Sequence, residues 1–196
     1  STMRKQRGEH TSKGRVSFLT SCTLSSSTGV FFIGAQMCAV TTALASVYRL
    51  YRFNQVKITI LPEVINAASA NVGAIAVWYS PTLLSTAPTN VFDAEAQHMT
   101  TSSNGCRVPR SFTIPREALR TVVDWFATED DATETSLNRM GAVYVMCSTT
   151  SETPTLYFEV TVDYEFKEPL DSAVIGALVQ EGRLARSAPT PGGYQQ

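Results

Sequence analysis

The stretch TLYFEVTVDYEFK, residues 155–167, decides the fold of this chain. Apolar side chains alternate in it with polar and acidic ones, which is the pattern of a β-strand with one dry face and one wet face. The run from Phe158 to Phe166 covers nine residues, so at about 3.3 Å per residue the strand is roughly 30 Å long. The expected dry face consists of Phe158, Val160, Val162, Tyr164 and Phe166.

A second stretch, YRLYRFNQVKITILP at residues 48–62, changes its period in the middle. The apolar residues fall at helical spacing up to Tyr51 and alternate with polar residues from Gln55 onward. We therefore predict a short helix over Thr41–Tyr51 that runs directly into a strand over Arg52–Leu61, which the following proline ends.

Strand-like segments recur along the chain, and other helical patterns are confined to connections and to the C-terminal end. Eight strands are predicted, near residues 15–24, 30–34, 53–61, 73–79, 108–114, 122–128, 142–148 and 156–167. Several connections are long, which argues against a simple meander. The pattern predicts an all-β fold: an eight-stranded antiparallel jelly-roll sandwich with short helices in the connections.

Charge divides the chain into an arm and a body. Residues 1–15 carry a net charge of +4 within a chain of net charge −1, so the remainder is acidic. We predict a flexible basic arm over 1–13, a body over 14–169 and a C-terminal extension over 170–196. Such an arm suits contact with a polyanion, and a solvated tail that keeps the protein soluble is the alternative.

Composition narrows the class of protein. The chain is 43% hydrophobic and only 17% charged, against about 25% charged residues in typical domains, so it is either all-β or hides much surface in contacts. No apolar run is long enough to span a membrane. The four cysteines lack metal-type spacing, and buried free thiols are preferred over disulfides, which favours a reducing compartment. They are Cys22, Cys38, Cys106 and Cys147.

Patterns typical of enzymes are absent from the sequence. The only histidines are His10 and His98, and the Cys106–His98 pair is interpreted as two unrelated loop residues. No phosphate-binding loop, dinucleotide fingerprint or zinc-protease motif occurs. We therefore predict that the chain is not an enzyme.

In their order along the chain, these stretches resemble coat proteins of small icosahedral RNA viruses of the sobemovirus and tombusvirus type. The segment ALASVYRLYRFNQVKITILP (43–62) is similar to the family's short helix and fourth strand, and FTIPREALRTVVDWF (112–126) to its strand, proline and aromatic-rich strand. The final strand LYFEVTVDYEFKEP (156–169) and the basic arm complete the resemblance, which covers roughly residues 14–169. It implies a capsid subunit that self-assembles around RNA in the host cytoplasm and resides in the virion.

The resemblance also implies where the chain meets its partners. The arm would bind RNA phosphates without reading bases, because it offers cations and no aromatic residues that could stack. Its basic residues are Arg4, Lys5, Arg7, Lys13 and Arg15, and a longer basic segment could precede them. Arg49 and Arg52 flank the predicted helix end and would meet a neighbour's acidic surface or RNA. The alternative is that both are solvated or stabilise the helix end by charge.

The C-terminal extension contains one helical pattern, from Ala173 to Arg186. An apolar stripe of this kind does not support a helix alone in water, so the helix must pack on its own body or on a neighbour. The neighbour is the preferred interpretation. The stripe consists of Val174, Ile175, Leu178 and Val179, and the first three are predicted to contact the neighbouring subunit.

Calcium is the cofactor that the resemblance raises. Many coat proteins of this family bind Ca²⁺ between subunits through Asp residues after the fifth strand, where a hard cation bridges carboxylates. Ser80 stands where the first Asp would be, so that site is not carried over. Asp93 and Glu95 are the remaining candidates, with ordinary acids on an exposed helical turn as the alternative; the acidic residues 129–131 are interpreted as a solvated loop.

The alternative function is a non-viral jelly roll that binds ligands, such as a lectin-like module. Lectin sites need clustered aromatic and acidic residues on loops. Trp78 and Trp125 fall within predicted strands instead, which favours the capsid interpretation.

Overall fold

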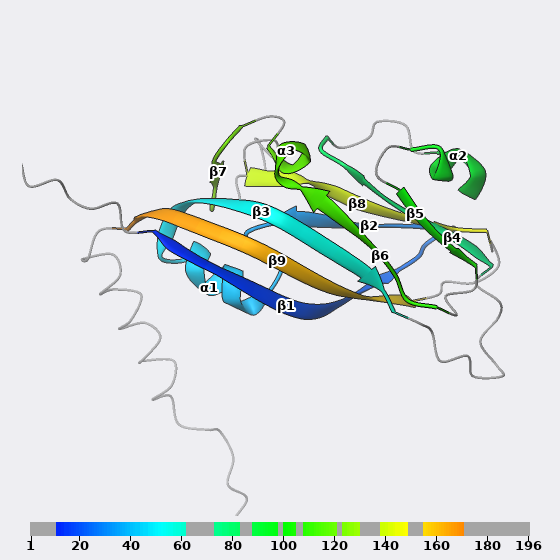
Figure 1. Ribbon diagram of the computed structural model, residues 1–196, viewed down its shortest axis with the longest axis horizontal. Helices are drawn as coiled ribbons and strands as arrows, with labels where there is room; N and C mark the ends of the chain where they lie inside the picture. The colour runs from blue at the N-terminus through cyan, green and yellow to red at the C-terminus, as the bar shows by residue number, and fades with distance from the viewer. Residues whose placement is uncertain are drawn as a thin grey trace, which may run out of the picture.

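The computed structural model describes residues 11–61, 73–82, 88–97, 100–104, 108–120, 123–129, 138–148 and 155–170. Two antiparallel sheets lie one behind the other, and short helices occupy the connections (Figure 1). The chain crosses repeatedly from one sheet to the other, which is the connectivity of a double-sheet jelly roll. The predicted all-β jelly-roll sandwich is therefore confirmed.

The first sheet has the strand order β1-β9-β3-β6, with β7 also paired to β3. Its long central strand β9 is the one that the alternating stretch predicts. It lies between β1 and β3 over nearly its whole length, from the pair Ser12–Phe166 to the pair Ile60–Phe158. The strands are β1 (Ser12–Thr23), β3 (Tyr48–Ile60), β6 (Arg110–Pro115), β7 (Phe126–Ala127) and β9 (Thr155–Pro169).

The second sheet has the strand order β2-β8-β4-β5. Its strands are β2 (Thr28–Gly34), β4 (Ala74–Ser80), β5 (Thr100–Asn104) and β8 (Arg139–Cys147). The helices are α1 (Ala39–Ala45), α2 (Val91–Glu95) and α3 (Arg116–Leu119). Helix α2 packs Val91 and Ala94 on Trp78 at the outer face of this sheet, so β4 is buried on both faces, as its continuous apolar run predicts.

The main core lies between the two sheets. From β9 it receives Phe158, Val160 and Val162, none of which is exposed to solvent. Tyr51 lies at one end of the core, with its ring centroid 5.2 Å from that of Phe53. Its hydroxyl donates a hydrogen bond of 2.7 Å to the backbone carbonyl of Asn138, the residue just before β8 of the second sheet. This bond ties β3 to the start of β8.

The predicted helix over Thr41–Tyr51 is wrong in its second half. Helix α1 ends at Ala45, and β3 begins at Tyr48. The residues from Tyr48 onward pair with the end of β9, and Tyr51 also pairs with Phe126 of β7. Long-range pairing and burial of aromatic rings therefore override the local helical spacing, which is a weak preference by comparison.

The predicted number of strands is also wrong, because the described residues alone form nine strands rather than eight. The additional strand β5 has the polar sequence TTSSN, which carries no apolar alternation, and it forms by pairing with β4. The strand predicted over 122–128 is reduced to the two residues of β7. β5 is defined by its pairing with β4, and such pairing is not encoded locally.

Three of the four cysteines can be placed. Cys22, Cys38 and Cys147 are free thiols, and the first and last are buried, whereas Cys106 lies outside the described residues. Over the described part of the chain, no helix is long and apolar enough to cross a membrane.

Candidate functional site

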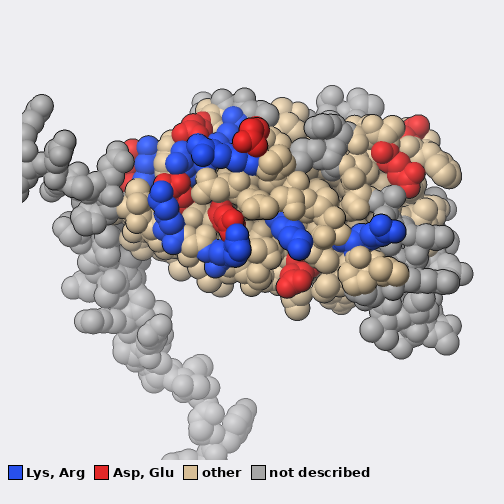
Figure 2. All heavy atoms as spheres, in the orientation of Figure 1, with Lys and Arg blue, Asp and Glu red and all other residues tan. Residues whose placement is uncertain are grey.

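The outer face of the first sheet carries a charged cluster where β1 and β3 begin and β9 ends (Figure 2). β1 begins at Ser12, so Lys13 and Arg15 belong to a paired strand. Their Cα partners across the ladder are Glu165 and Asp163 of β9. Alternation along both strands therefore places each cation opposite an acid on one face, a favourable cross-strand arrangement.

Both cations form close ion pairs across this ladder. The Lys13 ammonium lies 2.7 Å from Glu165 Oε1. The Arg15 guanidinium binds Asp163 at both carboxylate oxygens, with 2.8 Å from Nη2 to Oδ2. The two cationic side chains are 63% and 68% exposed, so solvent weakens these pairs. Lys13 and Arg15, two of the residues predicted to bind RNA, are nevertheless already paired with acids of their own chain.

Arg52 joins β3 to the same cluster. Its guanidinium donates to Glu165 Oε2 at 2.9 Å and to Asp124 Oδ2 at 2.8 Å, and its side chain is only 16% exposed. It also stacks over the Trp125 ring, 4.0 Å from the centroid, and Lys167 lies 4.2 Å from the same centroid. Arg52 is therefore held by groups of its own chain, at a strand position rather than at a helix end.

Arg120 extends the cluster toward α3. It donates to Asp124 Oδ1 at 2.9 Å and to the Asn54 side-chain oxygen. Burial lowers the pKa of Arg120 most, and the positive charges of Arg52 and Arg116 lower it further. Asp124 thus bridges two arginines of one chain and offsets their mutual repulsion.

The carboxyl groups of β9 are tuned by these contacts. The hydrogen bonds from Arg15 lower the pKa of Asp163 below its ordinary value of 3.8, although slight burial opposes the effect. For Glu165, burial alone would raise the pKa, but hydrogen bonds from Lys13 and Arg52 and their charges outweigh it, so the pKa falls below 4.5. Both acids are therefore ionised in the folded chain at neutral pH.

We expect the free energy of unfolding to fall as the pH is lowered from about 6 to about 3, partly because of these two acids. The unfolded chain binds their protons at the ordinary pKa values, whereas the folded chain binds them only at lower pH. Their stabilisation is complete above the ordinary values and is lost as the pH falls through the folded values. Urea titrations at each pH measure the slope.

The matched control is the double variant Asp163→Asn, Glu165→Gln, which keeps side-chain size and removes both titrations. Its free energy of unfolding should be lower than that of the unchanged chain at neutral pH and should depend less on pH in the acid range. An unchanged acid slope in this variant would show that the cluster does not contribute to acid sensitivity.

The other predicted site residues are distributed as follows. Arg49 is exposed on β3, and its backbone carbonyl accepts from the Thr128 N–H at 3.0 Å; among the described residues its side chain has no ion pair. The remaining predicted residues lie outside the described ranges. They are Arg4, Lys5, Arg7, Val174, Ile175 and Leu178.

Of the two metal candidates, Asp93 and Glu95, the first has partners at the start of its own helix. Ser80 is buried and donates to the Thr82 carbonyl at 2.6 Å. Asp93 accepts from Asn90 Nδ2 at 2.6 Å while its backbone N–H donates to Asn90 Oδ1, so the pair caps α2. Over the described residues no group of three potential ligands converges. Calcium binding at Asp93 and Glu95 stays a prediction.

Sequence reasoning missed half of the charged cluster. Asp163 and Glu165 were recognised only as an acidic strand face, and Asp124, Arg120 and Trp125 were not considered as its partners. The alternating acids in β9 were the available signal, because a strand face with acids at every second position needs cations on the flanking strands. The identity of those flanking strands required the fold.

No protein-family model and no curated protein matches the chain. Solved structures do match: that of Cocksfoot mottle virus aligns with a TM-score of 0.67 at 14% identity, over 88% of this chain and 93% of that chain. Mud crab tombus-like virus gives 0.61 at 13% identity, over 87% and 94%. T=3 Penaeus vannamei nodavirus gives 0.66 at 14%, over 89% and 59%.

At these identities the likeness shows the fold alone. The fold is that of the capsid proteins of small icosahedral RNA viruses, which confirms at the level of architecture the resemblance seen in the sequence.

Proposed function

We propose that this chain is a capsid subunit that self-assembles into an icosahedral shell around RNA. The observation that supports the proposal most is the match of a whole jelly roll, rather than of a few strands, to viral capsid proteins: 88% of this chain aligns with 93% of the Cocksfoot mottle virus chain. The virion is the corresponding location, and we propose that assembly takes place in the host cytoplasm.

Exposed apolar side chains supply surface for contacts between subunits. Among the described residues, four large apolar side chains are more than half exposed, and we propose that they take part in contacts between subunits. They are Leu19, Phe92, Val108 and Tyr157. We also propose that Arg49 contacts a neighbouring subunit, because its exposed side chain is not held by a described acid. Arg52 would reach a neighbour only through the atoms that its own acids leave accessible.

Contact with RNA is assigned to the part of the arm before β1. Lys13 and Arg15 already have carboxylate partners that offset their charge, so they would attract phosphate less than unpaired cations do. Arg4, Lys5 and Arg7 precede the strand and carry the remaining positive charge of the arm. We therefore propose that these three residues supply most of the phosphate contacts.

The lectin-like alternative has little support. Trp78 is buried under α2, and the face of Trp125 is occupied by Arg52 and Lys167. Neither ring is free to stack on a sugar. We also propose no catalytic role.

The proposal is tested by electron microscopy and size-exclusion chromatography of the purified chain. Closed particles of uniform size are expected, and the ratio of absorbance at two wavelengths that separate nucleic acid from protein should indicate encapsidated RNA. A monomer or dimer that persists at every salt concentration would contradict the proposal.

We expect the triple variant Arg4→Ala, Lys5→Ala, Arg7→Ala to bind single-stranded RNA with a weaker salt dependence. Each lost phosphate contact removes about 0.7 from the slope of log K against log salt, so the slope should fall in magnitude by about two. Fluorescence anisotropy at several KCl concentrations measures it. The control Lys13→Ala, Arg15→Ala should change the slope much less; an equal or larger change there would contradict the assignment.

A further inference from the structure

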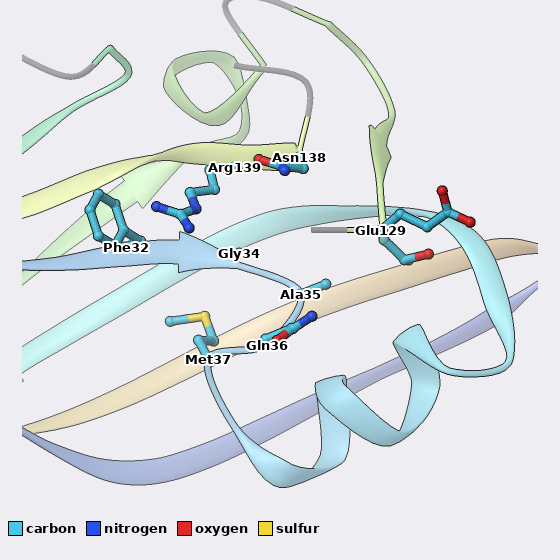
Figure 3. Close-up of a pocket in the computed structure, with 9 residues that line it drawn as sticks. Phe32, Gly34, Ala35, Gln36, Met37, Glu129, Asn138 and Arg139 are labelled. Carbon is cyan, nitrogen blue, oxygen red and sulfur yellow. The ribbon is translucent and has the colours of Figure 1, made fainter. Parts of the chain in front are cut away.

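A cavity of about 290 Å³ opens at the end of β2, where the chain turns toward α1 (Figure 3). The figure shows Phe32 and Met37 beside the opening and Arg139 reaching from β8 toward Phe32. The Arg139 guanidinium lies 4.3 Å from the centre of the Phe32 ring. Phe32 is still 39% exposed, so the cavity leaves an aromatic surface in contact with water.

The size and lining of this cavity suit side chains better than a large ligand. Cavities that bind drug-sized molecules usually measure about 300–1,000 Å³, so this one is at the lower limit. Its walls combine apolar groups of Phe32 and Met37 with the acidic side chain of Glu129, and the one basic lining residue, Arg139, has its guanidinium over the Phe32 ring. An amphipathic segment with aliphatic residues and a few cations would match both surfaces.

The chain leaves the sandwich close to this cavity. The backbone N–H of Leu170, the last described residue, donates to the Val47 carbonyl at 2.8 Å. Thr128 lines the cavity, and its backbone N–H and hydroxyl donate to the carbonyls of Arg49 and Tyr48. The exit of the chain and one wall of the cavity are therefore attached to three consecutive residues, 47–49.

The segment that follows has the required composition. Residues 171–196 comprise 26 residues, with an aliphatic stripe at helical spacing and the cations Arg183 and Arg186 after it. Leu170 and the lining residue Thr128 are bonded to residues only two positions apart, 47 and 49, so a short length of chain can join them, since one residue of extended chain covers up to about 3.5 Å. Such a short tether gives a high effective concentration at the cavity of the same chain.

We propose that the stripe of Val174, Ile175 and Leu178 docks in the cavity at Phe32 and Met37 of its own chain. The short tether favours the own chain over the neighbouring subunit, and burial of the stripe satisfies its need for an apolar contact. Arg183 and Arg186 would then follow near Glu129. The segment covers the exposed ring of Phe32 whether or not the chain forms a shell.

Disulfide trapping in the full chain tests the proposal. The pair Met37→Cys with Leu178→Cys is made in a Cys38→Ser background and oxidised at low protein concentration. An intrachain disulfide, seen as a shifted monomer band, should form at least tenfold faster than in the control pair Lys57→Cys with Leu178→Cys, because Lys57 is exposed in the middle of the other sheet. A dimer band, which would show capture by a neighbour, or a yield equal to the control would overturn it.

Hydrogen exchange gives a second readout that needs no cysteine. In the variant Leu178→Asp, the amides of residues 32–40 should exchange several-fold faster than in the unchanged chain, because the cavity loses its cover. The control Gln180→Asp adds the same charge two residues away, outside the stripe, and should leave these amides unchanged. Equal exchange in the unchanged chain and in Leu178→Asp would overturn the proposal even if trapping succeeded. Neither readout requires assembly or RNA, so failure of this proposal and failure of the capsid proposal are distinguishable.

Discussion

Replacing Gly141 by alanine is expected to lower the free energy of unfolding by about 2–5 kcal/mol, from backbone strain and overpacking together. Gly141 has φ of +120°, a conformation that residues with a side chain rarely adopt. An added Cβ would press against the backbone carbonyl oxygen of Ser80 and come within 2.7 Å of the Tyr79 ring. Ser80 and Tyr79 belong to β4, which pairs with the strand of Gly141, β8. The two strands cannot move apart to make room without breaking the hydrogen bonds between them.

The matched control is Gly34→Ala. A Cβ there would have its nearest neighbours at 3.7 Å, an ordinary contact, and Gly34 does not have a positive φ. Urea denaturation of both variants measures the difference. We expect the second variant to change the free energy of unfolding by no more than about 1 kcal/mol, the size of the effect when alanine suits the backbone conformation of the glycine it replaces. Equal losses in the two variants would contradict the explanation from backbone conformation.

Replacing Tyr51 by alanine is expected to lower the free energy of unfolding by about 3–5 kcal/mol, as for other large aromatic side chains removed from a core. Tyr51 is not exposed at all and packs against the rings of Phe53, Phe126 and Phe166. The resulting cavity would lie at the contact between β3, β7 and β9, where α1 has just ended. The same site explains why the helix stops early.

The variant Tyr51→Phe separates packing from hydrogen bonding. It keeps the ring and removes the hydroxyl with its bond to the Asn138 carbonyl, so a loss of about 1–2 kcal/mol is expected. Chemical denaturation of both variants separates the contribution of the hydrogen bond to the free energy of unfolding from that of ring packing. If the phenylalanine variant were as unstable as the alanine variant, the hydrogen bond rather than ring packing would dominate.

The sequence predicts the parts of the fold that rest on local alternation. β9 and the buried strand β4 follow directly from their own residues, and so does the jelly-roll class, because β strands with long connections leave few other arrangements. The start of β3 could not be predicted, since Tyr48–Tyr51 have helical spacing and become a strand only through pairing with β9 and β7. The polar strand β5 could not be predicted for the same reason.

The sequence predicts the cations of the charged cluster but only part of the way in which the cluster is arranged. Lys13, Arg15 and Arg52 were selected for their charge, and the fold does bring them onto one face. Their acidic partners lie more than 70 residues away in sequence in most pairs, for instance 148 residues between Arg15 and Asp163. Only the sheet order makes such pairs neighbours. Side-chain charge therefore indicates candidates, and topology decides which of them are already neutralised.

The pairing of the first strand, β1, with the last strand, β9, has a mechanical consequence. Because β1 and β9 are antiparallel neighbours, the chain enters the sandwich at Ser12 and leaves it at Pro169 on the same end (Figure 1). A tensile load applied through both extensions would act on one pair of backbone hydrogen bonds at a time, as a zipper opens, instead of shearing the whole ladder at once. The subunit should therefore yield at low force when it is pulled by its ends in an optical trap.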